Sequence, residues 1–216
     1  MIRLSKTGKM SGIRSFSLQA VDTCPGARKS NGELVDACKG CYATTGNYNY
    51  PNVKAPRIHN REDWKRKEWV SEMVEEIDSN DRYFRWFDSG DIYHTKLAEK
   101  IYAVCAATPH CQHWIPTRSH KFKKFKSVLE ALDSLPNVMV RYSSDSIVGE
   151  YTPGLHGSTI MPEEHKDSSI TKCEAYERGG KCGSCRLCWN KDIDVIGYVQ
   201  HGRKMKSVML NKVKEK

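Results

Sequence analysis

The sequence predicts an α/β domain, either a partial (β/α) barrel or an open parallel sheet. Segments with the pattern of buried strands alternate along the chain with segments in which apolar residues recur at helical spacing. The connections between successive strands are long enough for parallel pairing, and a polar or cysteine-rich motif follows each strand. Since ligands bind at the carboxyl ends of parallel strands, we expect the functional site at that edge of the sheet.

The expected elements run in the order β-α-β-α-β-α-β. Strands are predicted on short segments rich in apolar, aromatic and β-branched residues: 13–21, 83–87, 113–117 and 137–143. Helices are predicted where one apolar face repeats: 61–78, 95–107 and 121–133. Thr95 is expected to cap the start of the second helix.

The regular pattern ends after residue 146. Residues 147–172 read as loops, and a second group of cysteines follows them. We therefore expect an α/β core over 1–146 and a loop-rich, cysteine-containing appendage with a basic tail over 147–216. A chain of 216 residues is long enough to bury a core without disulfides, so the cysteines are not needed as staples.

Composition indicates a cytoplasmic protein with an anionic partner. No apolar segment is long enough to span a membrane, and the first residues lack the apolar stretch of a signal peptide. The formal net charge of +9 favours a nucleotide, a nucleic acid or a phosphorylated cofactor as partner. Much of the excess lies in 121–126 and 201–216, which form either one binding face or an ordinary helix surface and a frayed end.

Seven of the nine cysteines form two groups, a pattern typical of metal binding in the cytoplasm. The first group, Cys24, Cys38 and Cys41, leaves one position of a metal site open. An iron–sulfur cluster there would offer one iron to a small molecule, whereas a zinc site would be completed by a histidine such as His59. The second group can close a site around zinc or a four-iron cluster: Cys173, Cys182, Cys185 and Cys188.

An acidic turn follows the second predicted strand. It consists of Asp88, Ser89, Gly90 and Asp91. One interpretation is a ligand-binding turn, in which Gly90 lets a ligand approach the backbone and the acids accept hydrogen bonds. The other is an ordinary strand-to-helix turn capped by Asp91. Its expected place beside the first cysteine group favours a ligand site.

Arginines mark the other strands. Arg118 follows the third strand together with Thr117 and is suited to grip a carboxylate or a phosphate. Arg85 and Arg141 occur inside apolar strands, so each must reach solvent, find an acid or face a polar interior. We count Arg118 and Arg141 as candidate cofactor-binding residues, and we expect Trp114 in the core.

These motifs resemble a known family. The run YFRWFDSGDIYHTKLAEKIYAVCAATPHCQHWIPTRSHKF is similar to the phage gene-product-88 domain family, and so are CKGCYA and KCGSCRLCW. The similarity extends over roughly residues 10–201. It implies a phage-encoded protein that acts in the host cytoplasm, but no particular reaction.

A more distant resemblance is to radical S-adenosylmethionine (SAM) enzymes. In these, a cysteine loop after the first barrel strand holds a [4Fe-4S] cluster whose open iron chelates SAM, and a turn after the second strand contacts the SAM amine. The resemblance implies a cluster at the first cysteine group, SAM contacts at residues 89–91 and an auxiliary cluster at the second group. The spacing here is C-x13-C-x2-C, where those enzymes have C-x3-C-x2-C.

Three functions are therefore open. The first is a radical SAM-like enzyme that takes an electron from a donor and abstracts hydrogen from a nucleotide or nucleic acid, with Asp88, Asp91 and Arg118 as catalytic residues. The second is a base-exchanging transglycosylase on nucleic acid, with Asp88 or Asp91 as nucleophile and structural zinc at the second cysteine group. The third is a metal-stapled protein that binds nucleic acid in a salt-dependent way without catalysis.

Overall fold

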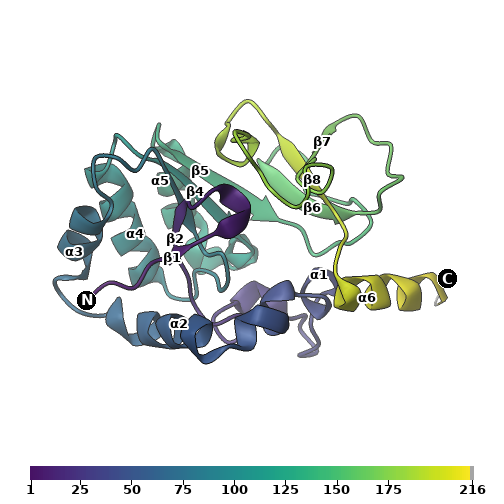
Figure 1. The fold of residues 1–216 in the computed structure, drawn as a ribbon, viewed down its shortest axis with the longest axis horizontal. Helices are drawn as coiled ribbons and strands as arrows, with labels where there is room; N and C mark the ends of the chain where they lie inside the picture. The colour runs from purple at the N-terminus through teal and green to yellow at the C-terminus, as the bar shows by residue number, and fades with distance from the viewer. Residues whose placement is uncertain (215–216) are drawn as a thin grey trace.

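A computed structural model gives the structure of residues 1–214, which is built around one eight-stranded sheet (Figure 1). The strands lie in the order β1-β2-β3-β4-β5-β6-β8-β7, and every neighbouring pair except β1 and β2 is parallel. The predicted α/β class is confirmed, while the sheet is open rather than closed into a barrel. The bounds are β1 Ser5–Lys6, β2 Arg14–Phe16, β3 Tyr83–Trp86, β4 Gln112–Thr117, β5 Val138–Ser143, β6 Gly157–Met161, β7 Ile170–Lys172 and β8 Val195–Val199.

Six parallel strands, β2 to β6 and then β8, follow one another across the sheet in chain order. Crossovers between parallel strands are right-handed. When each new strand is added on the same side of the last one, all the connections therefore lie on one face of the sheet, as in (β/α) barrels. Helix α4 (Thr95–Ala107) connects β3 to β4, and α5 (Lys126–Ser134) connects β4 to β5. The two helices pack side by side, so the first half of the sheet has a helical layer.

The helix predicted over 61–78 is in fact two helices. Helix α2 (Pro51–Asp63) begins at a proline, which is favoured in the first turn, and α3 (Trp69–Glu76) begins after a break. Trp64 lies in that break, and its buried indole N–H donates to the Tyr93 hydroxyl at 2.8 Å. The break between α2 and α3 therefore lies at a side chain that is anchored in the core.

The other two predicted helices are present with altered starts. Helix α4 covers the predicted residues, but its cap is His94, whose Nδ1 accepts from the backbone N–H of Lys96. The prediction of Thr95 as cap was therefore wrong by one residue. Helix α5 begins only at Lys126, after two 3-10 turns. None of the described helices is long and apolar enough to span a lipid bilayer.

Residues 147–172, predicted as loops, contribute two strands to the same sheet. Strand β6 pairs with β5 on one side and β8 on the other, and β7 forms the edge. The sequence of β6, GSTIM, starts with small residues and has no apolar pattern typical of a strand. Its residues are buried because β5 and β8 lie on either side. Strands β5 and β6, which lie on either side of the boundary expected at residue 146, therefore belong to one continuous sheet. Between β5 and β8 the described chain contains no α-helix.

Candidate functional site

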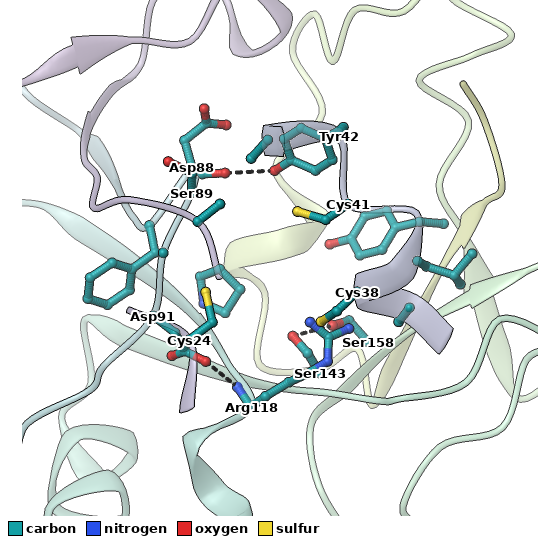
Figure 2. A pocket seen from close by; sticks show the side chains of 18 of the residues that line it. Cys24, Cys38, Cys41, Tyr42, Asp88, Ser89, Asp91, Arg118, Ser143 and Ser158 are labelled. Atoms are coloured by element: carbon teal, nitrogen blue, oxygen red, sulfur yellow. Dashed lines mark hydrogen bonds between the residues drawn. The ribbon is translucent and has the colours of Figure 1, made fainter. Parts of the chain in front are cut away.

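A cavity of about 460 Å³ lies at the carboxyl ends of the parallel strands (Figure 2). The segment that carries the first cysteine group, residues 17–44, is called the cysteine loop and lines the cavity after β2. The acidic turn 88–91 lines it after β3. Thr117 and Arg118 line it after β4, and Ser143 and Ser158 line it from β5 and β6. Segments far apart in the chain therefore meet at the edge of the sheet where a parallel sheet is expected to bind ligands.

Cys24, Cys38 and Cys41 line this cavity and carry free thiols. Burial raises the pKa of all three thiols, and the negative charge of Asp91 adds to the rise at Cys24. The thiols are near enough to raise one another's pKa, whereas Arg118 lowers that of Cys38 and Cys41. The cavity wall thus holds protonated thiols, which become thiolates when they bind a metal cation.

The long spacing between Cys24 and Cys38 is absorbed by a loop whose ends meet. The backbone N–H of Val35 donates to the carbonyl of Ala27 at 2.9 Å, so residues 28–34 form an excursion away from the site. Helix α1 (Asp36–Lys39) then carries Cys38, and the N–H of Cys41 donates to the carbonyl of Cys38. The thirteen intervening residues therefore do not prevent the three cysteines from sharing one cavity.

Gly90 is the point where the acidic turn packs on the start of the cysteine loop. Its φ is +81°, and a β-carbon there would lie 2.5 Å from Leu18 Cβ and 2.8 Å from Thr23 Oγ1. The N–H of Asp91 donates to the carbonyl of Thr23, and the N–H of Leu18 donates to the carbonyl of Ser89. The glycine thus permits close approach of two protein segments, while its backbone lines the cavity.

Asp88 is held by cations and hydroxyls. Its Oδ1 accepts from Arg85 at 2.8 Å, its Oδ2 accepts from the Tyr48 hydroxyl at 2.5 Å, and Arg57 lies 3.5 Å from Oδ2. The Tyr42 hydroxyl donates to the backbone carbonyl of Asp88 at 2.7 Å (Figure 2). Arg85 is therefore ion-paired with Asp88, and pairing with an acid was one of the arrangements expected for an arginine in an apolar strand.

Asp91 joins the acidic turn to the end of β4. Its Oδ1 accepts from Thr117 Oγ1 at 2.7 Å. Its Oδ2 accepts from the backbone N–H of Arg118 at 2.8 Å (Figure 2). Burial raises the pKa of this carboxyl to about 6. The Arg118 guanidinium donates to the carbonyl of Ser144 at 2.7 and 3.1 Å and lies 3.6 Å from Asp145. These bonds fix the turn and the arginine on the cavity wall.

Arg141 does not belong to the cavity lining. It is fully buried, and its guanidinium makes six hydrogen bonds to backbone carbonyls. Five of the six acceptors lie in the segment that carries the end of the second cysteine group: Leu187, Cys188, Asn190, Ile193 and Asp194. Because its N–H groups are engaged inside the protein, we leave Arg141 out of the candidate cofactor site.

The second cysteine group faces the same cavity as the first. Cys173, Cys182 and Cys188 line it, and the N–H of Cys185 donates to the carbonyl of Cys182 at 3.0 Å. The Cys188 sulfur lies 3.4 Å from the Tyr198 hydroxyl, and burial raises the pKa of this thiol to about 11. Three of the four cysteines expected on a separate appendage therefore line the same cavity as the first group.

Within residues 1–214, no three side chains of His, Cys, Asp or Glu gather closely enough to hold one metal ion. A [4Fe-4S] cluster makes a different demand, because each of its cysteines binds a different iron. Trp114 packs with Cys182 and Cys188, and its buried indole N–H finds no acceptor in the described chain, which suits a donor to cluster sulfur. Both cysteine groups offer thiolate sulfur, a ligand type that iron–sulfur clusters and zinc both accept. His59, the candidate to complete a zinc site, lies instead 3.3 Å from Asp63.

Comparison with protein families gives a match over most of the chain. A family model described as Gene product 88 fits residues 2–191. The chain belongs to the gene product 88 family. No curated protein and no solved structure matches it. The resemblance to the gene product 88 family is thereby confirmed, and that to radical SAM enzymes stays a prediction.

One wall of the cavity lies beyond the part matched to the gene product 88 family. Strand β8 contributes Tyr198, and helix α6 (Arg203–Lys214) contributes Met205. A β-carbon at Gly40 would lie 2.5 Å from Met205 Cε, so α6 packs on the cysteine loop at that glycine. Sequence reasoning missed these residues because β8 was hidden in the expected appendage. A glycine between two cysteines was the signal that another segment approaches there.

Proposed function

We propose that this member of the gene product 88 family is a radical SAM-like iron–sulfur enzyme, with its cluster at the first cysteine group. The observation that carries the proposal is convergence: three cysteines, an acidic turn and an arginine from three consecutive strand ends line one cavity. Further support comes from the six parallel strands in chain order, which is the arrangement a partial (β/α) barrel requires.

In this proposal Cys24, Cys38 and Cys41 would hold a [4Fe-4S] cluster, and the iron without a cysteine would be available to bind SAM. With an electron from an external donor, the loaded site would cleave SAM to methionine and a deoxyadenosyl radical, and that radical would abstract hydrogen from a nucleotide or nucleic acid. The second cysteine group would hold an auxiliary cluster or zinc. Support for this comes from Cys173, Cys182 and Cys188, which line the same cavity as the first group.

The other residues act by holding and orienting. Arg118 provides a fixed positive charge on the wall that also carries Cys38 and Cys41, and this charge suits the carboxylate of SAM. Ser89 and Asp91 act through the backbone, because their side chains are bonded to Leu18 and to the end of β4. They keep the turn in the position where Gly90 lines the cavity.

The transglycosylase alternative requires Asp88 or Asp91 to attack a sugar carbon. A carboxylate nucleophile needs an oxygen that is free to attack. Asp88 is ion-paired with Arg57 and Arg85, and both oxygens of Asp91 accept hydrogen bonds from the end of β4 or from the turn itself. These contacts favour a positioning role for both aspartates and therefore the iron–sulfur proposal.

Metal analysis of protein purified without oxygen tests the proposal. We expect about four irons and four sulfides per chain at the first group, and their loss in the variant with Cys24→Ala, Cys38→Ala and Cys41→Ala. Cys105→Ala is the matched control, because Cys105 is buried away from the cavity lining and should leave the iron content unchanged. A protein that binds zinc but no iron at the first group would refute the proposal.

A further inference from the structure

Two basic segments that lie far apart in the sequence both meet the cysteine loop. Residues 118–126 contain five lysines and arginines and no acidic residue. Residues 201–212 contain four and again no acidic residue. From the sequence alone these segments were either one binding face or a helix surface and a frayed end, and the contacts of each segment show where it lies.

The first basic segment lies against the start of the cysteine loop. Lys121 Nζ donates to the carbonyl of Gly26 at 3.1 Å and to Asp145 at 2.5 Å. A β-carbon at Gly26 would come within 2.5 Å of Arg118 Cβ, so the two backbones touch. The next lysines, Lys123 and Lys124, are exposed. This segment therefore forms one side of the rim of the site.

The second basic segment, helix α6, lies against the end of the same loop. Figure 1 shows α6 beside α1, and Lys212 Nζ donates to Asp36 in α1 at 2.7 Å. Lys204 Nζ donates to Thr44 Oγ1, three residues beyond Cys41, at 2.8 Å. Lys206 is exposed on the same helix. A frayed end was one of the two alternatives for this segment, and Arg203–Lys214 instead form a helix that packs beside the site.

Acidic side chains at these contacts are already paired. Asp36 accepts from both Lys39 and Lys212, and Asp145 accepts from Lys121 and lies near Arg118. Their negative charge is therefore used to dock the two segments. The lysines that remain exposed give the rim an excess of positive charge, which suits a chain of phosphates.

An aromatic ring lies among these lysines. Phe122 is 36% exposed between Lys121 and Lys123, and its ring packs edge-on against buried Phe125. Tyr42, 45% exposed, lines the cavity itself. Exposed aromatic rings within a basic groove stack with the unpaired bases of single strands, while a duplex keeps its bases paired and out of reach.

We propose that single-stranded nucleic acid binds across the mouth of the cavity, with its phosphates on Lys123, Lys124 and Lys206 and a base on Phe122. The reaction of one nucleotide inside the cavity rests on the proposed function, but the binding itself needs no cluster. A polymer suits this arrangement better than a free nucleotide, because these three lysines lie outside the cavity lining and would contact phosphates next to the nucleotide in the cavity.

Fluorescence anisotropy with labelled 15-nucleotide DNA and RNA strands tests the binding. The variant Lys123→Ala/Lys124→Ala should bind about tenfold more weakly, with a salt slope lower by about 1.4, since each phosphate contact on a single strand contributes about 0.7. Phe122→Ala should also cost about tenfold, with an unchanged slope. Lys65→Ala/Lys67→Ala, two exposed lysines between α2 and α3, is the matched control and should bind normally.

Equal affinity of the rim variant and the control would overturn the inference, and so would equal affinity for a duplex of the same length. Iron is measured on the same preparations. Strand binding without iron would leave the inference standing and refute the proposed enzyme. A protein with iron at the first cysteine group and no affinity for either strand would refute the inference alone.

Discussion

Gly90 lies so close to Leu18 that a β-carbon at residue 90 would come within 2.5 Å of Leu18 Cβ. Leu18 is fully buried at the start of the cysteine loop, and the carbonyl of Ser89 accepts from its N–H. The acidic turn and the loop are therefore one packed unit. The position of the first cysteine group depends on a glycine that does not itself ligate anything.

Gly90→Ala should destabilise the protein more than the same change at a glycine with a similar backbone conformation but open surroundings. Gly12 is that control, since its φ is +83° and a β-carbon added there would have no neighbour within 4 Å. We expect a loss of about 1 kcal/mol in the free energy of unfolding for Gly12→Ala and about 3 kcal/mol for Gly90→Ala. Urea denaturation measures both, and equal losses would contradict the packed unit.

Arg141→Met should lower the free energy of unfolding by about 3 kcal/mol or more, because it leaves buried carbonyls without a donor. The effect should be greatest in residues 187–194, whose carbonyls the guanidinium binds. Hydrogen exchange should therefore accelerate there before it does in α4. Uniform acceleration along the chain would mean that Arg141 supports the whole core rather than this segment.

Met205→Ala should open the cysteine loop to reagents. The Met205 side chain fills the notch at Gly40, so its removal uncovers the segment between Cys38 and Cys41. We expect several-fold faster alkylation of Cys41 by iodoacetamide in the metal-free protein. Leu210→Ala is the control, because Leu210 is 64% exposed on the same helix. Unchanged alkylation in both variants would show that α6 does not cover the site.

The elements that could be predicted from the sequence are those whose buried residues form an apolar pattern along the chain. Strand β3 and the turn that follows it were found because YFRWF is an apolar run that ends in polar residues. Strand β6 was missed because its small residues are buried by β5 and β8, which is a tertiary effect. The break at Trp64 was missed because this residue keeps the helical spacing of apolar side chains on both sides of the break.

The candidate site was predictable in part. Cys24, Cys38, Cys41 and the turn 88–91 were expected together because each follows a strand of a parallel sheet, and all line one cavity. The role of Arg141 could not be predicted, because backbone carbonyls, its actual partners, leave no trace in the sequence. The place of the second cysteine group on the same cavity could not be predicted either, because it depends on β6 and β8 joining the same sheet.

Stability should fall with pH between 6.5 and 4 through His113. Burial lowers the pKa of this histidine to about 4, and its Nδ1 lies 3.3 Å from the indole nitrogen of Trp86. Below its ordinary pKa of about 6.5 the unfolded chain takes up the proton and the folded protein does not. The free energy of unfolding should therefore drop by roughly 3 kcal/mol by pH 4.

Urea denaturation of wild type and His113→Gln at pH 7 and pH 4.5 measures this contribution as the difference between their pH dependences. The comparison is needed because Asp91 acts in the opposite direction. Its pKa is raised to about 6, so its burial costs less stability as the pH falls from about 6 toward 4. Parallel pH profiles of the two proteins would show that His113 is protonated in the folded state.

Electron paramagnetic resonance of the reduced, iron-reconstituted protein tests the central claim most directly. If Cys24, Cys38 and Cys41 leave one iron without a protein ligand, addition of SAM should change the spectrum of the cluster at that site. The cysteine-to-alanine variant at residues 173, 182, 185 and 188 isolates this signal from any second cluster. A spectrum that stays the same with saturating SAM would contradict the account.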